Sequence, residues 1–235
     1  MISGSGIKTM VYAAMRQEER LESATHNIAN ADTAGFKAEQ LRFLEKITGE
    51  GSTGRSAMTI DYTQGGLHKT GNVLDLAIEG EGFLAVQTKD GIAYTRDGRV
   101  TLNESGELMS LAGEHVLNRD GKKITVSGND VQISGTGTVR VDGTEIDTLK
   151  IVRFQDPSAL VKLNARLYRD PVNRAGARED EASQIKSGYL ELSNVQVVRE
   201  MVGMINIQRT FESYQKAIQT IEDQNEASTS RIGRL

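Results

Sequence analysis

The sequence predicts an α+β fold in which N- and C-terminal helices form a coiled-coil layer and flank a central, mainly antiparallel β domain. Of the 24 glycines, 20 lie between Gly35 and Gly188, and glycine weakens a helix interior by about 1 kcal/mol relative to alanine. Apolar residues recur every seven positions at both ends, whereas Asp-Gly pairs punctuate the middle. We therefore expect a terminal helical domain over 1–34 and 189–235, an extended connector over 35–74, and a β domain over 75–188.

The first helix is expected over residues 7–34, with its apolar residues confined to a narrow seam. Such a stripe is typical of a coiled coil rather than of a helix lying on a globular core. Two heptad positions make up the seam, namely Ile7, Met10, Ala14, Gln17, Leu21, Ala24 and Ile28. Gly35 is expected to end this helix in a left-handed conformation, which glycine adopts without strain.

The last helix is expected over residues 193–232 and repeats the same design. Its seam consists of Val197, Met201, Met204, Gln208, Phe211 and Ile218. Over the first half of the helix, Val198, Val202 and Ile205 widen the apolar face. The two seams favour packing between helices, within one subunit or between subunits. Spacing alone does not distinguish a polymer from an isolated stalk or a dimer.

The middle of the chain is expected to be β structure. Asp-Gly pairs at 90–91, 97–98, 120–121 and 142–143 predict hairpin turns, because such turns require positive φ angles. Between and around the pairs, short apolar runs predict strands at 76–78, 83–88, 93–95, 100–102, 107–110, 123–126, 131–133, 139–141 and 148–154. Residues 49–54 are expected to form a flexible loop, and 155–188, which hold both prolines, are expected to be irregular.

Composition excludes several kinds of chemistry. The formal net charge of -4 gives no electrostatic reason to expect nucleic-acid binding. With no cysteine, the chain has no disulfide, thiolate metal site or thiol nucleophile. No apolar run is long enough for a membrane span. The apolar residues 10–15 are followed at once by charged residues, which does not fit a cleaved signal peptide.

The candidate reaction sites are weak. Residues 80–85 match a dinucleotide-binding fingerprint, but a strand-like run follows where that fingerprint needs a helix. Gly80 and Gly82 are therefore interpreted as a tight turn or bulge before Phe83. The three histidines lack metal-ligand spacing. No nucleophile motif is present. We expect no catalytic site, cofactor or metal.

Several segments, in order along nearly the whole chain, resemble the signatures of bacterial flagellar rod and hook proteins. They are residues 27–37, 64–67, 70–83, 94–98, 193–195 with 200–202, and 207–212. The residues that carry the resemblance include Asn27, Asn30, Thr33, Gly35, Phe36, Gly80, Gly82, Phe83, Ser193 and Asn194. The chain is too short to hold the large inserted domains of hook proteins. Within the family, residues 70–78 look most like the proximal rod protein, with the distal rod protein second.

The resemblance implies an axial subunit of the flagellar basal body. Such subunits leave the cell through the flagellar type III export apparatus without a cleaved signal and assemble helically in the periplasm into the drive shaft. The resemblance implies partners in other copies of the chain and in other rod proteins. It also implies that the terminal helices form the inner layer. The alternatives from other classes are an enzyme acting on the cell wall and a soluble coiled-coil adaptor.

Overall fold

The structure is a computed structural model that describes residues 4–48 and 51–232. The chain divides into two compact units. The first comprises 1–29, 39–59 and 196–235, and the second comprises 30–38 and 60–195. The chain therefore passes from one unit to the other at four places.

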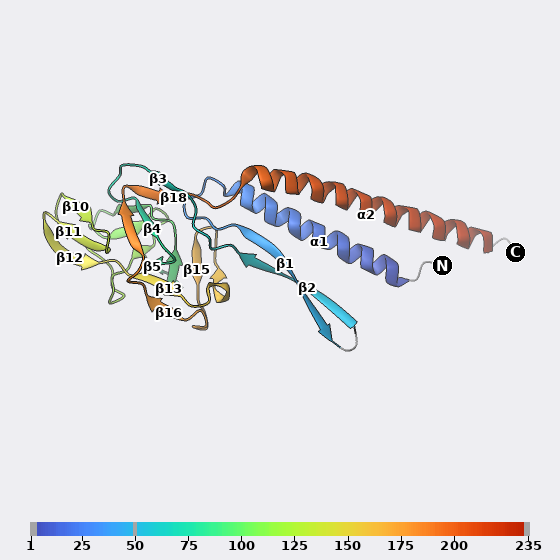
Figure 1. The fold of residues 1–235 in the computed structure, drawn as a ribbon, viewed down its shortest axis with the longest axis horizontal. Coiled ribbons are helices and arrows are strands. Elements are labelled where there is room, and N and C mark those ends of the chain that lie inside the picture. The colour runs from blue at the N-terminus through green and yellow to red at the C-terminus, as the bar shows by residue number, and fades with distance from the viewer. Residues whose placement is uncertain (1–3, 49–50, 233–235) are drawn as a thin grey trace. The chain divides into compact units, whose positions relative to one another are not determined.

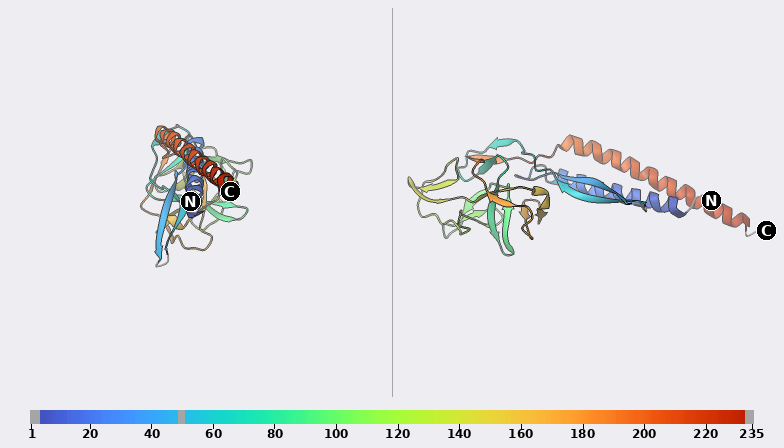
Figure 2. Two further views of the ribbon diagram at one scale, coloured as in Figure 1. Left: turned by 90° about the vertical axis from the view of Figure 1, so that its right-hand side faces the viewer. Right: turned by 60° about the horizontal axis from the view of Figure 1, so that its bottom comes forward.

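The first unit is built on two long helices, α1 (Gly4–Ala29) and α2 (Val197–Ile232), which lie side by side and run in opposite directions (Figures 1 and 2). Near the end of α1, Asn27 Nδ2 donates a hydrogen bond to Oε1 of Glu200, in the first turn of α2, at 3.1 Å. This contact fixes the alignment of the two helices. At 1.5 Å per residue, α1 is about 39 Å long and α2 about 54 Å, so the far end of α2 extends beyond the start of α1.

Helix α1 ends five residues before the sequence indicated. The amide of Thr33 bonds to the carbonyl oxygen of Asn30 at 3.1 Å, and the amide of Phe36 bonds to that of Thr33 at 3.2 Å. These turns replace the helical pattern over 30–35, where Asn30 and Asp32 have low helix propensity. Gly35 has the expected left-handed conformation, with φ at +68°. The expectation that it ends the helix was wrong, because the helix stops at Ala29.

Two ten-residue strands, β1 (Glu39–Thr48) and β2 (Gly51–Ile60), pair in a two-stranded sheet within the region expected to be a less regular connector. Residues 49 and 50 of the expected flexible loop lie outside the described residues, whereas 51–54 belong to β2. The glycine- and serine-rich sequence of β2 hid this strand. Backbone pairing needs little apolar patterning when a turn brings two segments together.

The second unit is formed by antiparallel strands, as expected. A nine-stranded sheet has the order β14-β15-β6-β5-β9-β8-β7, and β13 pairs with both β5 and β16. A three-stranded sheet has the order β10-β11-β12, and the pairs β17-β4 and β18-β3 complete the unit. The whole fold is thus an α+β mixture with mainly antiparallel sheets.

The bounds of these strands, in chain order, are β3 (Leu67–Lys69), β4 (Leu76–Glu79), β5 (Phe83–Thr88), β6 (Gly91–Thr95), β7 (Val100–Leu102), β8 (Leu108–Ser110), β9 (His115–Val116), β10 (Val131–Ile133), β11 (Thr138–Val141), β12 (Thr144–Thr148), β13 (Ile151–Phe154), β14 (Val161–Lys162), β15 (Leu167–Arg169), β16 (Ala177–Glu179), β17 (Gln184–Ser187) and β18 (Tyr189–Glu191). A 3₁₀ turn covers Pro157–Ala159.

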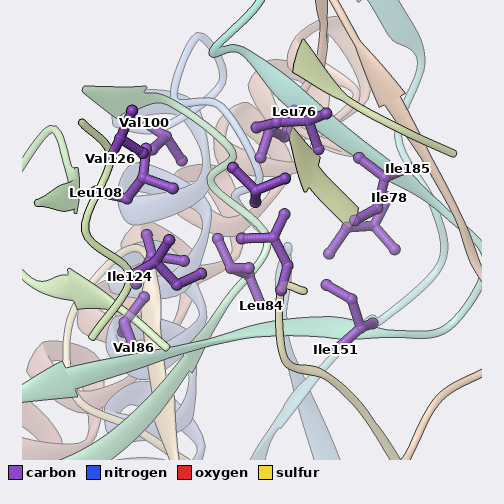
Figure 3. Packing of buried hydrophobic residues seen from close by; sticks show 14 of the residues in the cluster. Leu76, Ile78, Leu84, Val86, Val100, Leu108, Ile124, Val126, Ile151 and Ile185 are labelled. Atoms are coloured by element: carbon purple, nitrogen blue, oxygen red, sulfur yellow. The ribbon is translucent and has the colours of Figure 1, made fainter. Parts of the chain in front are cut away.

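Strand β5 lies between two apolar cores. Side chains alternate along a strand, so Leu84 and Val86 face a large aliphatic cluster, which Figure 3 shows, while Phe83 and Ala85 face a smaller aromatic cluster. In the aromatic cluster, the rings of Phe83 and Phe154 meet edge to face with centroids 5.4 Å apart. A strand buried on both faces reads as a continuous apolar run, which is why 83–88 was identified correctly.

Three of the four Asp-Gly pairs lie at turns. Asp142 and Gly143, with φ of 50° and 84°, connect β11 to β12 in a two-residue hairpin. The pairs at 90–91 and 120–121 also occupy tight turns. The pair at 97–98 was misread. A Cβ on Gly98 would lie 1.5 Å from the carbonyl oxygen of Leu76, so this glycine is required by close backbone approach.

Three other expectations for the β region need correction. Residues 155–188 are not irregular throughout, because β14, β15, β16 and β17 lie there. Strands β15 and β17 pair with β6 and β4, which lie far away in sequence, whereas β16 pairs with β13 and β14 pairs with β15. Residues 123–126 make only isolated bridges to Leu117 and Glu107 rather than a strand. The expected strand at 148–154 is divided between β12 and β13. Such short strands depend on their partners, which a local pattern does not reveal.

Candidate functional site

Residues that adjoin the terminal helices in sequence come together inside the second unit. The amide of Gly35 donates to the carbonyl oxygen of Glu191 at 2.8 Å, and the amide of Ala38 donates to Oδ1 of Asn194 at 2.8 Å. Asn194 Nδ2 in turn donates to the carbonyl oxygen of Asp61 at 2.9 Å. Three separate passages of the chain are therefore tied to one another through residues of the terminal motifs.

A buried ion cluster, formed by Lys37, Arg96 and Glu191, lies at this meeting point. Lys37 Nζ is 2.6 Å from Oε1 of Glu191, and Arg96 Nη1 is 3.2 Å from Oε2. The three side chains are between 0% and 2% exposed. Lys37 also donates to the carbonyl oxygen of Thr63 at 2.7 Å, and Arg96 to that of Ile78 at 3.1 Å.

The ion cluster contains two cations and one carboxylate. Burial lowers the pKa of Lys37 and of Arg96, and Glu191 opposes that effect in both cases. Removing ions from water costs several kcal/mol each, and a buried pair recovers this only when its geometry and hydrogen bonds are good. The carboxylate of Glu191 therefore offsets part of the free-energy cost of desolvating both cations. The stability of the ion cluster depends on this residue.

Sequence reasoning missed the ion cluster as a unit. Lys37 and Arg96 lie within two of the family-like segments, but Glu191 was not singled out. No local pattern connects them, because Glu191 is separated from Lys37 by 154 positions. The available signal was limited to the position of Lys37 and Arg96 within segments that resemble the family's motifs.

The two motif phenylalanines each lie beneath a cation of the second unit. The guanidinium carbon of Arg96 is 5.0 Å from the ring centroid of Phe83, and Lys162 Nζ is 4.0 Å from that of Phe36. An aromatic face attracts a nearby cation. Both phenylalanines thus pack in the core and also help to hold charge near the ion cluster.

The motif glycines permit close packing. A Cβ on Gly35 would lie 2.3 Å from the carbonyl carbon of Arg96. A Cβ on Gly80, where φ is +131°, would lie 2.2 Å from the hydroxyl oxygen of Ser183, and one on Gly82 would lie 2.5 Å from Ile151. Because β4 precedes Gly80 and β5 follows Gly82, these residues link two strands and no helix follows them.

In the first unit, the face of α2 turned inward carries a heptad pattern of half-buried or buried residues. They are Val197, Glu200, Met204, Ile207, Phe211, Tyr214, Ile218 and Ile221. The intermediate residues of the predicted seam lie off this inward face, because Met201 is 50% exposed and Gln208 is also exposed. The inward face instead uses Glu200, and a shift of one residue rotates a helix by about 100°. Packing of Met201 between subunits remains a proposal. The four residues spaced by seven do lie on the inward face.

The predicted seam of α1 also lies partly buried. Ala24 is buried, and Met10, Ala14, Leu21 and Ile28 are half-buried. The side chain of Ile7 lies outside those that the structure describes. Within one chain these residues cover part of their surface, and their packing between subunits remains a proposal.

Asn27 is the most heavily bonded motif residue of the first unit. Its side chain is 1% exposed, donates to the carbonyl oxygen of Glu39 at 2.8 Å, and accepts from the amide of Glu39 at 2.8 Å. Together with its bond to Glu200, this joins α1, β1 and α2 through one amide group. A buried, satisfied Asn between helices is a known device for setting their register.

The remaining motif residues act locally. Asn30 accepts from the hydroxyl of Thr33 at 3.3 Å, which supports the turn after α1. Ser193 accepts from the amide of Val195 at 3.2 Å, just before α2 begins. Residues 193–196 are thus outside the helix that the sequence predicted from 193 onward.

Each helix also has an exposed apolar patch on its outer face. The α1 patch comprises Val11, Tyr12 and Met15, which are 41%, 64% and 54% exposed. The α2 patch comprises Val198, Met201, Val202 and Ile205, which are between 50% and 76% exposed. At 100° per residue, Val198, Val202 and Ile205 lie on the side of α2 away from the inward face, and Met201 lies at the edge between the two. These features are those of a structural protein whose terminal helices offer packing surfaces.

Within residues 4–48 and 51–232, no group of three or more His, Asp or Glu side chains is placed to hold a metal ion. Among the described helices, none has the length and apolar character needed to cross a membrane.

Three family descriptions match the chain in order. "Flagella basal body rod protein" matches residues 7–37, "Flagellar hook protein FlgE/F/G D1 domain" matches 77–141, and "Flagellar basal body rod FlgEFG protein C-terminal" matches 186–231. The chain is 36% identical to flagellar basal-body rod protein FlgF of Caulobacter vibrioides, covering 94% of this chain and 95% of the relative. It is 33% identical to FlgG of Bacillus subtilis, covering 88% and 90%.

The chain therefore belongs to the flagellar basal-body rod protein family, which confirms the resemblance found in its sequence. It is a structural subunit of the flagellar rod in the basal body and not an enzyme.

Replacing Glu191 with Gln should strongly destabilise the second unit. The change leaves Lys37 and Arg96 buried without a counter-charge, and breaking such a pair costs about 3–5 kcal/mol. As a control, Glu79→Gln removes an exposed partner of Lys186 and should cost less than about 1 kcal/mol. Urea unfolding measures both. Equal stabilities for the two variants would contradict the role given to Glu191.

Gly35→Ala should destabilise the protein more than Gly71→Ala does. Both glycines have a left-handed backbone, with φ of +68° and +80°, so both changes carry a conformational cost of about 1–2 kcal/mol. Only at Gly35 would the new Cβ meet other atoms, whereas nothing lies within 4 Å at Gly71. The difference in unfolding midpoint isolates the steric cost. A Gly35→Ala variant as stable as Gly71→Ala would disprove the close approach.

Proposed function

We propose that the chain is a proximal rod subunit that assembles helically through the outer faces of its helix pair. The observation that supports this most strongly is the α2 patch. Helix α2 is apolar on its inward face, where it contacts α1, and again on the opposite face, where Val198, Val202 and Ile205 are half or more exposed. A helix with apolar stripes on opposite faces is suited to packing on both sides.

In this proposal the helix pairs of many subunits form a coiled-coil inner layer, and each pair carries the second, β-rich unit of its subunit. Torque passes through repeated packing contacts along the shaft and requires no chemical step. The seam residues of α1 and α2 hold each pair together. The outer patches connect one pair to its neighbours, which include other copies of the chain and other rod proteins.

The proximal position is favoured over the distal one by the similarity to FlgF. The FlgF relative of Caulobacter vibrioides is matched over 94% of this chain at 36% identity, against 88% at 33% for the FlgG relative of Bacillus subtilis. The difference is small, so the distal position remains the second candidate. Neither an enzyme acting on the cell wall nor a soluble adaptor is supported by an observation of comparable weight.

We place the assembled subunit in the periplasm, reached through the flagellar type III export apparatus without removal of a signal peptide. The apolar residues 10–15, which could be mistaken for part of a signal, belong to helix α1. Met10 and Ala14 contribute to its half-buried face and Met15 to its outer patch. Cleavage after this segment would remove part of the helix pair that the proposal needs for assembly.

Val202→Glu should abolish incorporation into the rod while leaving the subunit folded. Val202 is 54% exposed, so the charge disturbs no core within the chain, but it would be buried without a partner in an assembled layer. Gln215→Glu places the same charge at another exposed position of α2. Circular dichroism measures helix content, and purified basal bodies and swimming assays measure incorporation. Normal assembly of Val202→Glu would contradict the proposal.

The proximal assignment is tested by the stage at which the protein enters the rod. When the distal rod protein is deleted, short rods should still contain this chain. When this chain is deleted, the distal rod protein should be missing from the rods. Mass spectrometry of the two kinds of arrested rod gives the answer. The reverse dependence would show that the chain is the distal subunit.

A further inference from the structure

The two outer patches are positioned to cover each other between subunits, and their separation along the helix pair sets a distance. We propose that the α1 patch of one subunit packs on the α2 patch of a second copy of this chain, which has the same orientation and is displaced by about 21 Å along the helix axis. This inference rests on the proposed assembly through the outer helix faces and specifies which surfaces meet.

Within one chain the two patches cannot meet. Asn27 is level with Glu200, and the helices are antiparallel, so Val11 is level with a residue near 216. Val202 is fourteen positions nearer the start of α2, which corresponds to about 21 Å at 1.5 Å per residue. The patches also lie on outer faces, opposite the inward faces of their helices. To be covered, each patch therefore needs a surface outside the chain.

Neighbouring copies in the same orientation cover both patches of each subunit. An axial displacement of about 21 Å makes Val11 level with Val202 of the neighbour and Met15 level with its Val198. The two patches are different surfaces, so each copy offers one patch to the next copy and receives the other from the previous one. Such a heterologous contact does not close on itself and produces an open filament.

The charges beside the patches agree with this arrangement. Glu18 and Glu22 follow the α1 patch on the same exposed face of α1. In the displaced copy, Glu18 is level with residue 195, within one turn of Arg199 and beside the N-terminal end of α2. The partial positive charge of a helix N-terminus and the guanidinium of Arg199 both favour nearby carboxylates. The acidic end of the α1 patch thus meets the basic end of the α2 patch.

The competing arrangement is a two-fold pair in which the copies point in opposite directions. It would make Val11 level with Val198 and Met15 level with Val202, and it would bring Glu22 near Arg209. Its charges are also complementary, so charge does not separate the two arrangements. Because the two patches of one copy face away from each other across the helix pair, a single two-fold contact cannot cover both patches of each copy, whereas a series of displaced copies in the same orientation does, which is why the same orientation is preferred.

Disulfide trapping in assembled rods separates the two arrangements, because the chain has no native cysteine. The paired variants Val11→Cys with Val202→Cys, and Met15→Cys with Val198→Cys, should cross-link after mild oxidation of purified basal bodies. The exchanged pairings, 11 with 198 and 15 with 202, should not. The two sets differ by about 6 Å along the axis, and a disulfide needs Cβ atoms within about 4.5 Å.

The expected product is a series of cross-linked species larger than a dimer, since each double variant can bond to two neighbours. Mixed expression of the single variants Val11→Cys and Val202→Cys should give dimers in rods even where a double variant assembles poorly. Cross-linking by the exchanged pairs, cross-links only to other rod proteins, or no cross-link in rods that contain the variants would each overturn the inference. These results would leave the proposed function intact. That function fails separately, if Val202→Glu assembles normally.

Discussion

The structure of the second unit depends on one shared carboxylate. Glu191 holds Lys37 through one oxygen and Arg96 through the other, and its carbonyl oxygen accepts from the amide of Gly35. The chain enters this unit at residue 30, shortly after α1 ends, and leaves it at 195, just before α2 begins. Gly35 and Lys37, near the entry, bond to Glu191, which lies near the exit. The cost of burying three charges is therefore linked to holding together segments that are distant in sequence.

The first unit also depends on a buried polar residue. That residue sets the register of the two helices rather than balancing buried charges. Asn27 is almost fully buried and bonds to Glu39 and Glu200. Sliding α2 by one turn would leave this amide and Glu200 without each other, at a cost typical of an unsatisfied buried group. The apolar seam supplies cohesion, but apolar contacts alone tolerate alternative registers. Fixing the register also fixes where the α1 patch and the α2 patch lie along the helix pair.

Sequence patterns predicted those parts of the fold whose signals are local. Both terminal helices, the hairpin at Asp142 and the doubly buried strand from Phe83 follow from heptads, positive-φ turn chemistry and apolar runs. The β1–β2 hairpin and the strands of 155–188 did not, because their pairing partners and not their own residues determine them. The ion cluster was equally hidden, since only the folded chain brings Lys37 and Glu191 together. The outward position of Met201 was missed because two nearly equivalent apolar stripes run along α2.

The helix pair exposes two outer patches, which the proposed assembly covers in the rod. Electron cryomicroscopy of purified basal bodies at side-chain resolution tests it directly. We predict that Val198, Val202 and Ile205 lie against α1 of a neighbouring subunit of the same orientation, displaced by about 21 Å along the axis. A rod in which these side chains face solvent, or in which adjacent helix pairs are level with one another, would contradict it.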